Sequence, residues 1–275
     1  MDNRMTVVFI GFDGYSDMWD DCMGLYRRFW PDCPYKTVFV NNQKDVSYDG
    51  AEVLHAGADA EWSRKVQAAL EAVDTPYVCL LLEDFLVGAA VDSDTVSQTL
   101  DLIEAHKVRY FKLTNMNRAA KNRDAAFAGK PYLHIIPQSD EYGVSLQPAI
   151  WRADYLAELV GEGNYNAWQF EFDRVHEAAG KPDEPNEGCV FDERNILQLQ
   201  HGVIQSKYLP GTVSYFKRLG INLNIERPIM SRAHYYRLRL QSKAKYMMPK
   251  GLRRKVKRLM EMLGYKFVST ERDRK

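Results

Sequence analysis

The two adjacent carboxylates Glu83 and Asp84 are the most suggestive chemical groups of this 275-residue chain, because they end the apolar run Tyr77–Leu82. Strands that are buried on both faces of a parallel sheet have such runs, and the ligands of these sheets bind beyond the carboxyl ends of the strands. Two carboxylates at that place can hold a divalent cation through their oxygens. The sequence therefore predicts a ligand site here, and a diphosphate is the obvious substrate partner of the cation.

A second candidate is Glu171, a carboxylate in the first turns of a predicted helix. Asn166 and Gln169 form a capping box, which predicts a helix that begins at Ala167. The helix dipole favours the ionised form of Glu171, and Trp168, three residues away on the same face, is expected to shield it from water. This environment suits a general base, although a plain surface glutamate would have the same pattern.

The elements that must position these groups alternate along the first half of the chain. Their order, βαββαβαβ over residues 6–114, predicts a mostly parallel sheet with covering helices. Strands are expected at residues 6–12, 36–40, 52–55, 77–82 and 109–114, and helices at 19–30, 62–73 and 96–103. No glycine-rich phosphate-binding pattern follows the first strand, which argues against a dinucleotide dehydrogenase or a P-loop enzyme.

The second half has a different character. Residues 115–130 are polar and alanine-rich and are predicted to form an excursion from the sheet. Residues 142–151 are predicted to form a strand, in which Pro148 requires an edge or a bulge. A short helix is expected over residues 154–160, ended by Gly161.

Composition describes an ordinary globular protein with 45% hydrophobic residues. The amino-terminal apolar run, residues 6–10, is too short for a signal peptide or a membrane span, so we expect a cytoplasmic protein. The four cysteines have no close-paired spacing, which favours buried free thiols over a metal site or disulfides.

The charge is distributed unevenly. The segment Arg227–Lys275 holds 16 basic and 3 acidic residues and carries +13, so the rest of the chain carries −13. Apolar residues recur at helical spacing between Leu252 and Leu263, which predicts a basic amphipathic helix. Residues 250–275 either pack this stripe on the domain or bind an anionic membrane surface. We expect no nucleic-acid partner, because the body is acidic and has no recognised binding motif.

Five stretches of the sequence together carry a resemblance to a known family, and they match in order and spacing over about residues 5–230. The stretches are residues 15–19 (YSDMW), 29–35 (FWPDCPY), 80–85 (LLLEDF), 145–151 (SLQPAIW) and 166–171 (NAWQFE). The chain resembles bacterial sugar-transfer proteins of the GT-A glycosyltransferase fold that are associated with capsule, exopolysaccharide or lipopolysaccharide assembly.

The resemblance implies a fold, a division of the chain and a reaction. Residues 1–230 would be a GT-A-like α/β domain, with a nucleotide-sugar half at 1–114 and an acceptor half at 115–230. Residues 231–275 would be a basic helical tail. The reaction would move a sugar from a nucleotide-diphospho-sugar to a hydroxyl of a glycan or lipid-linked acceptor. If the tail binds an anionic membrane, the protein would act on its cytoplasmic face, where a lipid-linked acceptor lies.

The resemblance also implies the roles of particular residues. Asp84 matches the last aspartate of the family's D-x-D motif, whose first position is Leu82 here, and would hold Mn²⁺ or Mg²⁺ on the diphosphate with Glu83 beside it. Glu171 matches the position of the catalytic base of inverting members.

Other residues of the donor half have expected roles as well. Phe12, Asp13 and Asp17 would meet the nucleoside, and Arg64 would approach the diphosphate, although Asp13 and Asp17 are also natural turn and cap residues. His201 or His234 could supply a further metal ligand from the carboxyl-terminal side.

Two other classes of function remain open. A protein of this fold with a changed acidic motif can be a non-catalytic scaffold in polysaccharide assembly. A sugar-phosphate nucleotidyltransferase uses a related sheet and cation, but it normally has a glycine-rich loop with Lys or Arg after the first strand. Gly11-Phe12-Asp13-Gly14 is a poor substitute for that loop.

Overall fold

The computed structural model describes residues 1–114 and 126–247, with the side chains of 241–247 excepted. Its strands are β1 (Met5–Ile10), β2 (Lys36–Asn41), β3 (Glu52–His55), β4 (Tyr77–Leu82), β5 (Phe85–Val87), β6 (Tyr110–Lys112), β7 (Ala126–Phe127), β8 (Lys130–Pro137), β9 (Ala149–Arg152), β10 (Pro185–Asp192), β11 (Leu199–His201), β12 (Val203–Ile204) and β13 (Lys207–Tyr208). Its helices are η1 (Asp13–Met18), α1 (Trp19–Phe29), α2 (Trp62–Ala72), α3 (Ser93–Ala105), α4 (Ala153–Val160), α5 (Ala167–Ala179), α6 (Pro210–Arg218) and α7 (Arg232–Met247).

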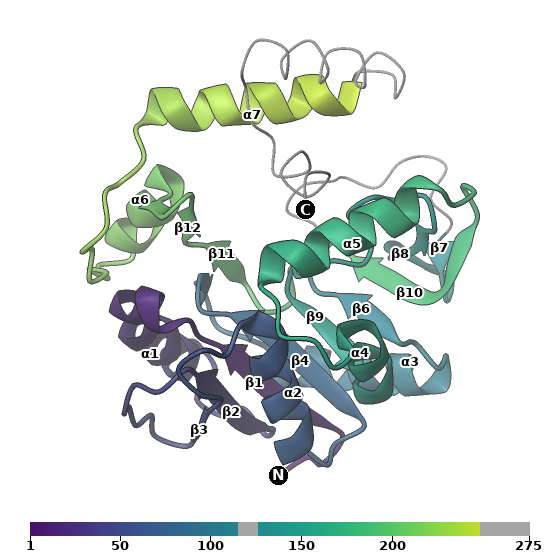
Figure 1. Cartoon of the computed structure of the whole chain (residues 1–275), viewed down its shortest axis with the longest axis horizontal. Helices are drawn as coiled ribbons and strands as arrows, with labels where there is room; N and C mark the ends of the chain where they lie inside the picture. The colour runs from purple at the N-terminus through teal and green to yellow at the C-terminus, as the bar shows by residue number, and fades with distance from the viewer. Residues whose placement is uncertain (115–125, 248–275) are drawn as a thin grey trace. The chain divides into compact units, whose positions relative to one another are not determined.

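The centre of the fold is a nine-stranded sheet of order β3-β2-β1-β4-β9-β6-β10-β8-β7 (Figure 1). Strands β3, β2, β1 and β4 are parallel neighbours, and β6 pairs in parallel with β10. Strands β9 and β8 run against the others. The predicted fold class is therefore confirmed: an α/β protein with a mostly parallel sheet flanked by helices.

The central strands are buried on both faces, which explains their uninterrupted apolar sequences. Alternate residues of β1, Val8 and Ile10, pack in a core that also holds Trp62 of α2, Leu156 of α4 and Phe170 of α5. Figure 1 shows α2 and α4 lying together in front of the sheet. Phe9, which lies between Val8 and Ile10 in β1, faces the other side of the sheet. Its ring lies 5.0 Å from the ring of Tyr26 in α1, measured between centroids.

The predicted strand over residues 142–151 is wrong, because only β9 at its end is a strand. Two of the backbone amides before β9 are bonded to side chains and not to a ladder: Ser145 N donates to the Tyr110 hydroxyl, and Leu146 N donates to Glu171. Pro148 has no amide hydrogen to donate. These bonds come from distant parts of the chain, and the local sequence pattern does not reveal them.

Several strands of the structure have no counterpart among the predicted ones: β5, β7, β8, β10, β11, β12 and β13. The excursion predicted for residues 115–130 lies mainly outside the described residues, but its end forms β7 and the first residue of β8. Strand β10, which the sequence pattern did not predict, inserts between β6 and β8.

All four cysteines are free as predicted, and Cys33 is the partly exposed one.

Contacts between residues divide the chain into two compact units. The first comprises Met1–Gly202 and Ile221–Glu226, and the second comprises Val203–Gly220 and the chain from Arg227 onward. In the second unit the β12–β13 hairpin is extended by bonds of Tyr208 with the backbone of Pro228 and Met230. Over the described residues, no helix is long and apolar enough to cross a membrane. The predicted donor half, acceptor half and tail remain predictions.

Candidate functional site

The loops after β1 and β4 meet at the point where the strand order of the sheet changes direction. Strands β1 and β4 are parallel neighbours, with Ile10 beside Leu82 at their carboxyl ends. From β1 the chain continues to β2 on one side, and from β4 it continues through α3 to β6 on the other side. A crevice at such a reversal is the usual ligand site of open α/β sheets. The structure therefore brings the turn at Phe12 next to the acidic pair Glu83 and Asp84.

Glu83 is the buried member of the acidic pair, with 8% of its surface exposed. Its Oε1 accepts a 3.4 Å hydrogen bond from the backbone amide of Phe12, so it joins the two loops. Burial, and to a smaller degree the neighbouring Asp84, raise the pKa of Glu83 to about 8. The attraction of Lys65 opposes this shift. Glu83 thus lies behind the loop surface and holds its shape.

Lys65 is a buried basic residue beside the acidic pair that the sequence prediction did not name. Its side chain in α2 is 2% exposed, and burial lowers its pKa although Glu83 and Asp13 favour the charged form. Its Nζ lies 5.2 Å from the centroid of the Phe12 ring, a cation–π contact. Lys65 follows Trp62 by three residues on the apolar stripe of α2, and this inward register was the available signal.

Arg64, the basic residue predicted to approach the diphosphate, is exposed at the position before Lys65 in α2. Its guanidinium donates a 3.0 Å hydrogen bond to Gln67 on the same helix. The structure therefore brings Lys65, not Arg64, against the acidic pair.

Asp84 is the accessible member of the acidic pair, with 21% of its side chain exposed. Its Oδ2 lies 3.1 Å from Nε2 of His201 in β11, and the His201 ring is stacked on Phe85 at 5.1 Å between centroids. Strand β11 reaches this place because it pairs with β5, directly after the acidic pair. The other carboxylate oxygen, Oδ1, is buried and has no hydrogen-bond partner among the described residues.

Asp84 and His201 are a partial donor set for a divalent cation. Within residues 1–114 and 126–247, no group of three or more His, Cys, Asp or Glu side chains could hold a metal ion. However, Mg²⁺ is commonly bound by one or two protein carboxylates together with substrate phosphates and water. The unpartnered Oδ1 of Asp84 and the imidazole of His201 fit two ligand positions of such a shared site.

The three residues expected at the nucleoside lie in the turn after β1 and in η1. Phe12 is 54% exposed, so its ring offers an open aromatic face. Asp13 accepts hydrogen bonds from the amides of Asn42 and Gln43, at 2.9 and 3.2 Å, and thereby joins the ends of β1 and β2. Asp17 is partly exposed in η1. Asp13 therefore has the turn-forming role that its residue type allows.

Glu171 lies in a different part of the first unit, near the carboxyl end of β6. Its Oε1 accepts a 2.5 Å hydrogen bond from the amide of Leu146. Burial raises the pKa of Glu171, while this bond and the charge of Lys112 oppose the shift. Lys112 is itself buried and donates a 2.6 Å bond to the carbonyl of Tyr142. A carboxylate with this raised pKa, held by the backbone of a loop, can act as a proton acceptor.

The helix that carries Glu171 begins as predicted, with Asn166 accepting the N-cap bond from the amide of Gln169 at 3.0 Å. The Gln169 side chain bonds Asp173, so the bond is a simple cap and not a reciprocal box. The expectation that Trp168 shields Glu171 is wrong, because Trp168 is 76% exposed. The Glu171 carboxylate instead contacts the loop at Leu146, whose amide donates to it.

Comparison with known proteins gives little beyond this geometry. Models of known families and curated proteins were both searched with the sequence, and neither search gives a match. Among solved structures, a fragment of Staphylococcus aureus TarS (residues 1–349) superposes with a TM-score of 0.42 and 9% identity, over 69% of this chain and 60% of that fragment. The same fragment in complex with UDP-GlcNAc gives a TM-score of 0.40 and 10% identity over 84% and 69%. A cytidylyltransferase from Leptospira borgpetersenii gives 0.38 and 11% over 68% and 79%.

The superposed region thus spans less than two thirds of the first TarS chain. At these identities and TM-scores the reaction has to be argued from the site itself. The family associated with capsule, exopolysaccharide or lipopolysaccharide assembly remains a prediction from the sequence resemblance.

Proposed function

We propose that this protein is a glycosyltransferase that moves a sugar from a nucleotide-diphospho-sugar to a hydroxyl group of a glycan or lipid-linked acceptor. The observation that carries the proposal is the Asp84–His201 pair, which lies beside the Phe12 turn where the strand order of the sheet reverses. A nucleotide bound at this crevice would have its diphosphate near Asp84. The exposed ring of Phe12 is suited to stack on its base.

Each residue of the site has a distinct role in the proposed reaction. Asp84 and His201 would hold Mn²⁺ or Mg²⁺, and a bound cation would offset the charge that develops on the departing nucleoside diphosphate. Glu83 and Lys65 support the Phe12 turn from below and fix the shape of the donor site. Glu171 accepts the proton of the acceptor hydroxyl as its oxygen attacks the anomeric carbon, and the configuration is inverted.

The partners of the reaction follow from the same proposal. A lipid-linked acceptor would lie at the cytoplasmic face of a membrane, and the basic residues of the carboxyl-terminal segment favour an anionic surface. Residues 250–275 lie outside the described residues, so this part of the proposal rests on their sequence alone.

The decisive experiment measures thermal stabilisation of the protein by nucleoside diphosphates, nucleoside triphosphates and nucleotide-sugars, each with and without Mn²⁺. A ligand that binds the folded state raises the melting temperature by mass action. We expect one nucleotide-sugar to stabilise the protein with Mn²⁺, and Asp84→Asn to lose this stabilisation while its ligand-free melting temperature stays nearly unchanged. Asp45→Asn is the matched control, because Asp45 pairs with His55 at 3.6 Å and is fully exposed.

Three outcomes would contradict parts of the proposal. If Asp84→Asn binds the donor as the wild type does, the cation has no place at Asp84. If the protein is stabilised by nucleoside triphosphates and not by nucleotide-sugars, nucleotidyl transfer replaces glycosyl transfer. If a nucleotide-sugar binds but is neither hydrolysed nor used with any acceptor, the protein is a scaffold of this fold.

A further inference from the structure

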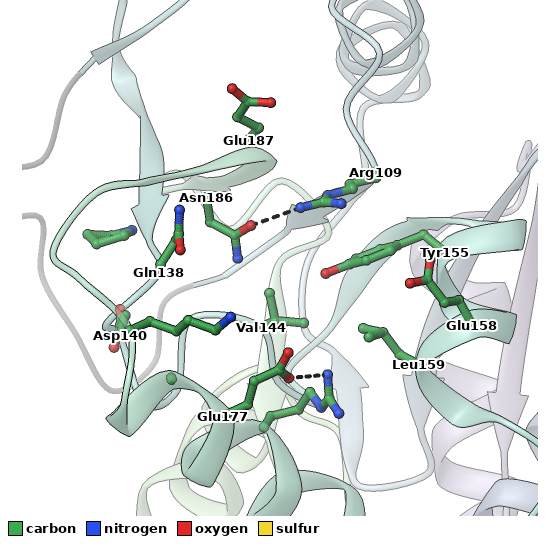
Figure 2. Close-up of a pocket in the computed structure, with 14 residues that line it drawn as sticks. Arg109, Gln138, Asp140, Val144, Tyr155, Glu158, Leu159, Glu177, Asn186 and Glu187 are labelled. Carbon is green, nitrogen blue, oxygen red and sulfur yellow. Dashed lines mark hydrogen bonds and ion pairs between the residues drawn. The ribbon is translucent and has the colours of Figure 1, made fainter.

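A cavity in the first unit lies away from the acidic pair. It has a volume of about 370 Å³ and is enclosed by α4, α5, the start of β10 and the end of β8. Figure 2 shows the side chains of Gln138, Asn186, Tyr155 and Glu177 turned toward the same space. A cavity of this size falls in the range of small-molecule sites.

The cavity lies at the amino-terminal ends of the parallel strands, whereas the acidic pair lies at a carboxyl-terminal end. Arg109 immediately precedes β6, and Asn186 is the second residue of β10, so both lie where these strands begin. Asp84 follows the end of β4, which runs in the same direction. The length of a six-residue strand, about 20 Å, therefore separates the two places along the strand direction.

The polar side chains of the cavity are held in place by contacts with one another. The Arg109 guanidinium donates a 3.0 Å hydrogen bond to Oδ1 of Asn186 and lies 4.6 Å from the ring centroid of Tyr155. Arg174 pairs with Glu177 at 2.5 Å, one turn along α5. Groups fixed in this way lose little further freedom when a ligand binds, which favours affinity.

The chemistry of the lining favours an uncharged ligand with many hydroxyl groups. Three basic side chains, of Arg109, Arg174 and Lys181, are outnumbered by four acidic ones, so the cavity has no excess of positive charge for an anion. Guanidinium and amide groups donate hydrogen bonds, and carboxylates accept them. A sugar hydroxyl can use both kinds of partner at once, because it is both a donor and an acceptor.

We propose that this cavity is a carbohydrate-binding site, separate from the donor site, that takes a neutral sugar residue of a glycan. The sugar hydroxyls donate to the carboxylates of Glu177 and Glu158 and accept from Arg109, Gln138 and Asn186. The site does not depend on the transfer reaction. In a transferase that acts on glycans, it would hold a sugar residue that does not react.

The test is a titration of the isotopically labelled full chain by NMR, with methyl glycosides of glucose, galactose and N-acetylglucosamine and with glucuronic acid. We expect at least one neutral glycoside to cause saturable shift changes at the residues that line the cavity. Arg109→Met and Glu177→Ala should each weaken this binding about tenfold, because each removes hydrogen bonds with a charged partner. Arg152→Met is the matched control, since Arg152 pairs with Asp154 at 2.5 Å outside the lining.

The melting temperatures of Arg109→Met and Glu177→Ala show whether weaker binding results from loss of folding. Glu177 is half exposed, so its replacement should leave the melting temperature nearly unchanged even if loss of the more enclosed Arg109 lowers it. The proposal is overturned if no neutral glycoside shifts the lining residues, or if both variants bind as tightly as Arg152→Met. Binding of glucuronic acid alone would overturn the neutral ligand class. None of these outcomes bears on donor binding at Asp84, which the thermal-shift panel tests separately.

Discussion

Replacement of Glu171 by glutamine is the sharpest test of the proposed base. The variant keeps an oxygen that can accept the 2.5 Å hydrogen bond from the Leu146 amide, but it removes the basic carboxylate. General-base catalysis contributes about 10²–10⁴-fold, so we expect turnover to fall by about a hundredfold or more. A hundredfold loss corresponds to about 2.7 kcal/mol in the activation barrier. Donor affinity should be retained, because Glu171 lies apart from the Asp84 group.

The same substitution has a small expected effect on folding. A hydrogen bond to a neutral acceptor is weaker than one to a carboxylate by about 1 kcal/mol, and relief of the buried charge offsets part of this loss. The melting temperature should therefore change by no more than about 2–4 °C. Loss of turnover with this small shift separates a chemical role from a structural one.

The pH dependence provides an independent measurement of the same group. Burial raises the pKa of Glu171, and a base must be ionised to act, so transfer should decline as the pH falls through this raised pKa. The glutamine variant should lack this limb in its residual activity. Asp173→Asn on the same helix is the control, since the Asp173 carboxylate accepts hydrogen bonds from the Gln169 side chain at 2.8 and 2.7 Å. Near wild-type turnover of Glu171→Gln, measured by release of the nucleoside diphosphate, would refute the assignment.

Two further predictions concern the support of the donor site and the tail. The pKa of Glu83 is about 8 in the folded protein and near 4.5 when unfolded, so between these values the folded state holds more protons and the free energy of unfolding falls as the pH rises. Glu83→Gln should flatten this decline of the unfolding free energy between about pH 5 and 8.5, measured in urea titrations. If the variant and the wild type give parallel plots of unfolding free energy against pH, the raised pKa of Glu83 is contradicted. Deletion of residues 250–275 should leave the melting temperature unchanged and abolish co-sedimentation with anionic vesicles, because each basic residue near such a surface contributes about 1 kcal/mol. A lower melting temperature with unchanged sedimentation would mean that the tail packs on the domain.

Local patterns in the sequence predict the elements of this fold well where burial is uniform. The apolar run of β4 is buried on both faces, as its sequence indicates, and the helix of Glu171 begins at its predicted cap. The apolar stripe of α2 correctly predicts a buried face, and Lys65 is buried on the same helix. These features depend on neighbours within a few residues of one another, which is why the sequence alone reveals them.

The parts that the sequence did not predict depend on contacts between distant residues. His201 meets Asp84 across 117 positions of the chain, through a pairing of β11 with β5 that no local pattern encodes. Trp168 points to solvent although its spacing from Glu171 is correct, because spacing on a helix does not say which side faces the sheet. The catalytic and binding roles of Glu171, Asp84, Phe12, Asp13 and Asp17 therefore remain predictions to be tested by the variants above.

The loop at Ser145 and Leu146 has a consequence for how this protein can diverge. Tyr110 and Glu171 hold this loop through its backbone amides, and every residue except proline has such an amide. Side chains of the loop can therefore be exchanged over generations, within the limits of their burial, while the carboxylate stays anchored in the same place. Relatives with the proposed chemistry would then share the path of this backbone even where the side chains of the loop differ.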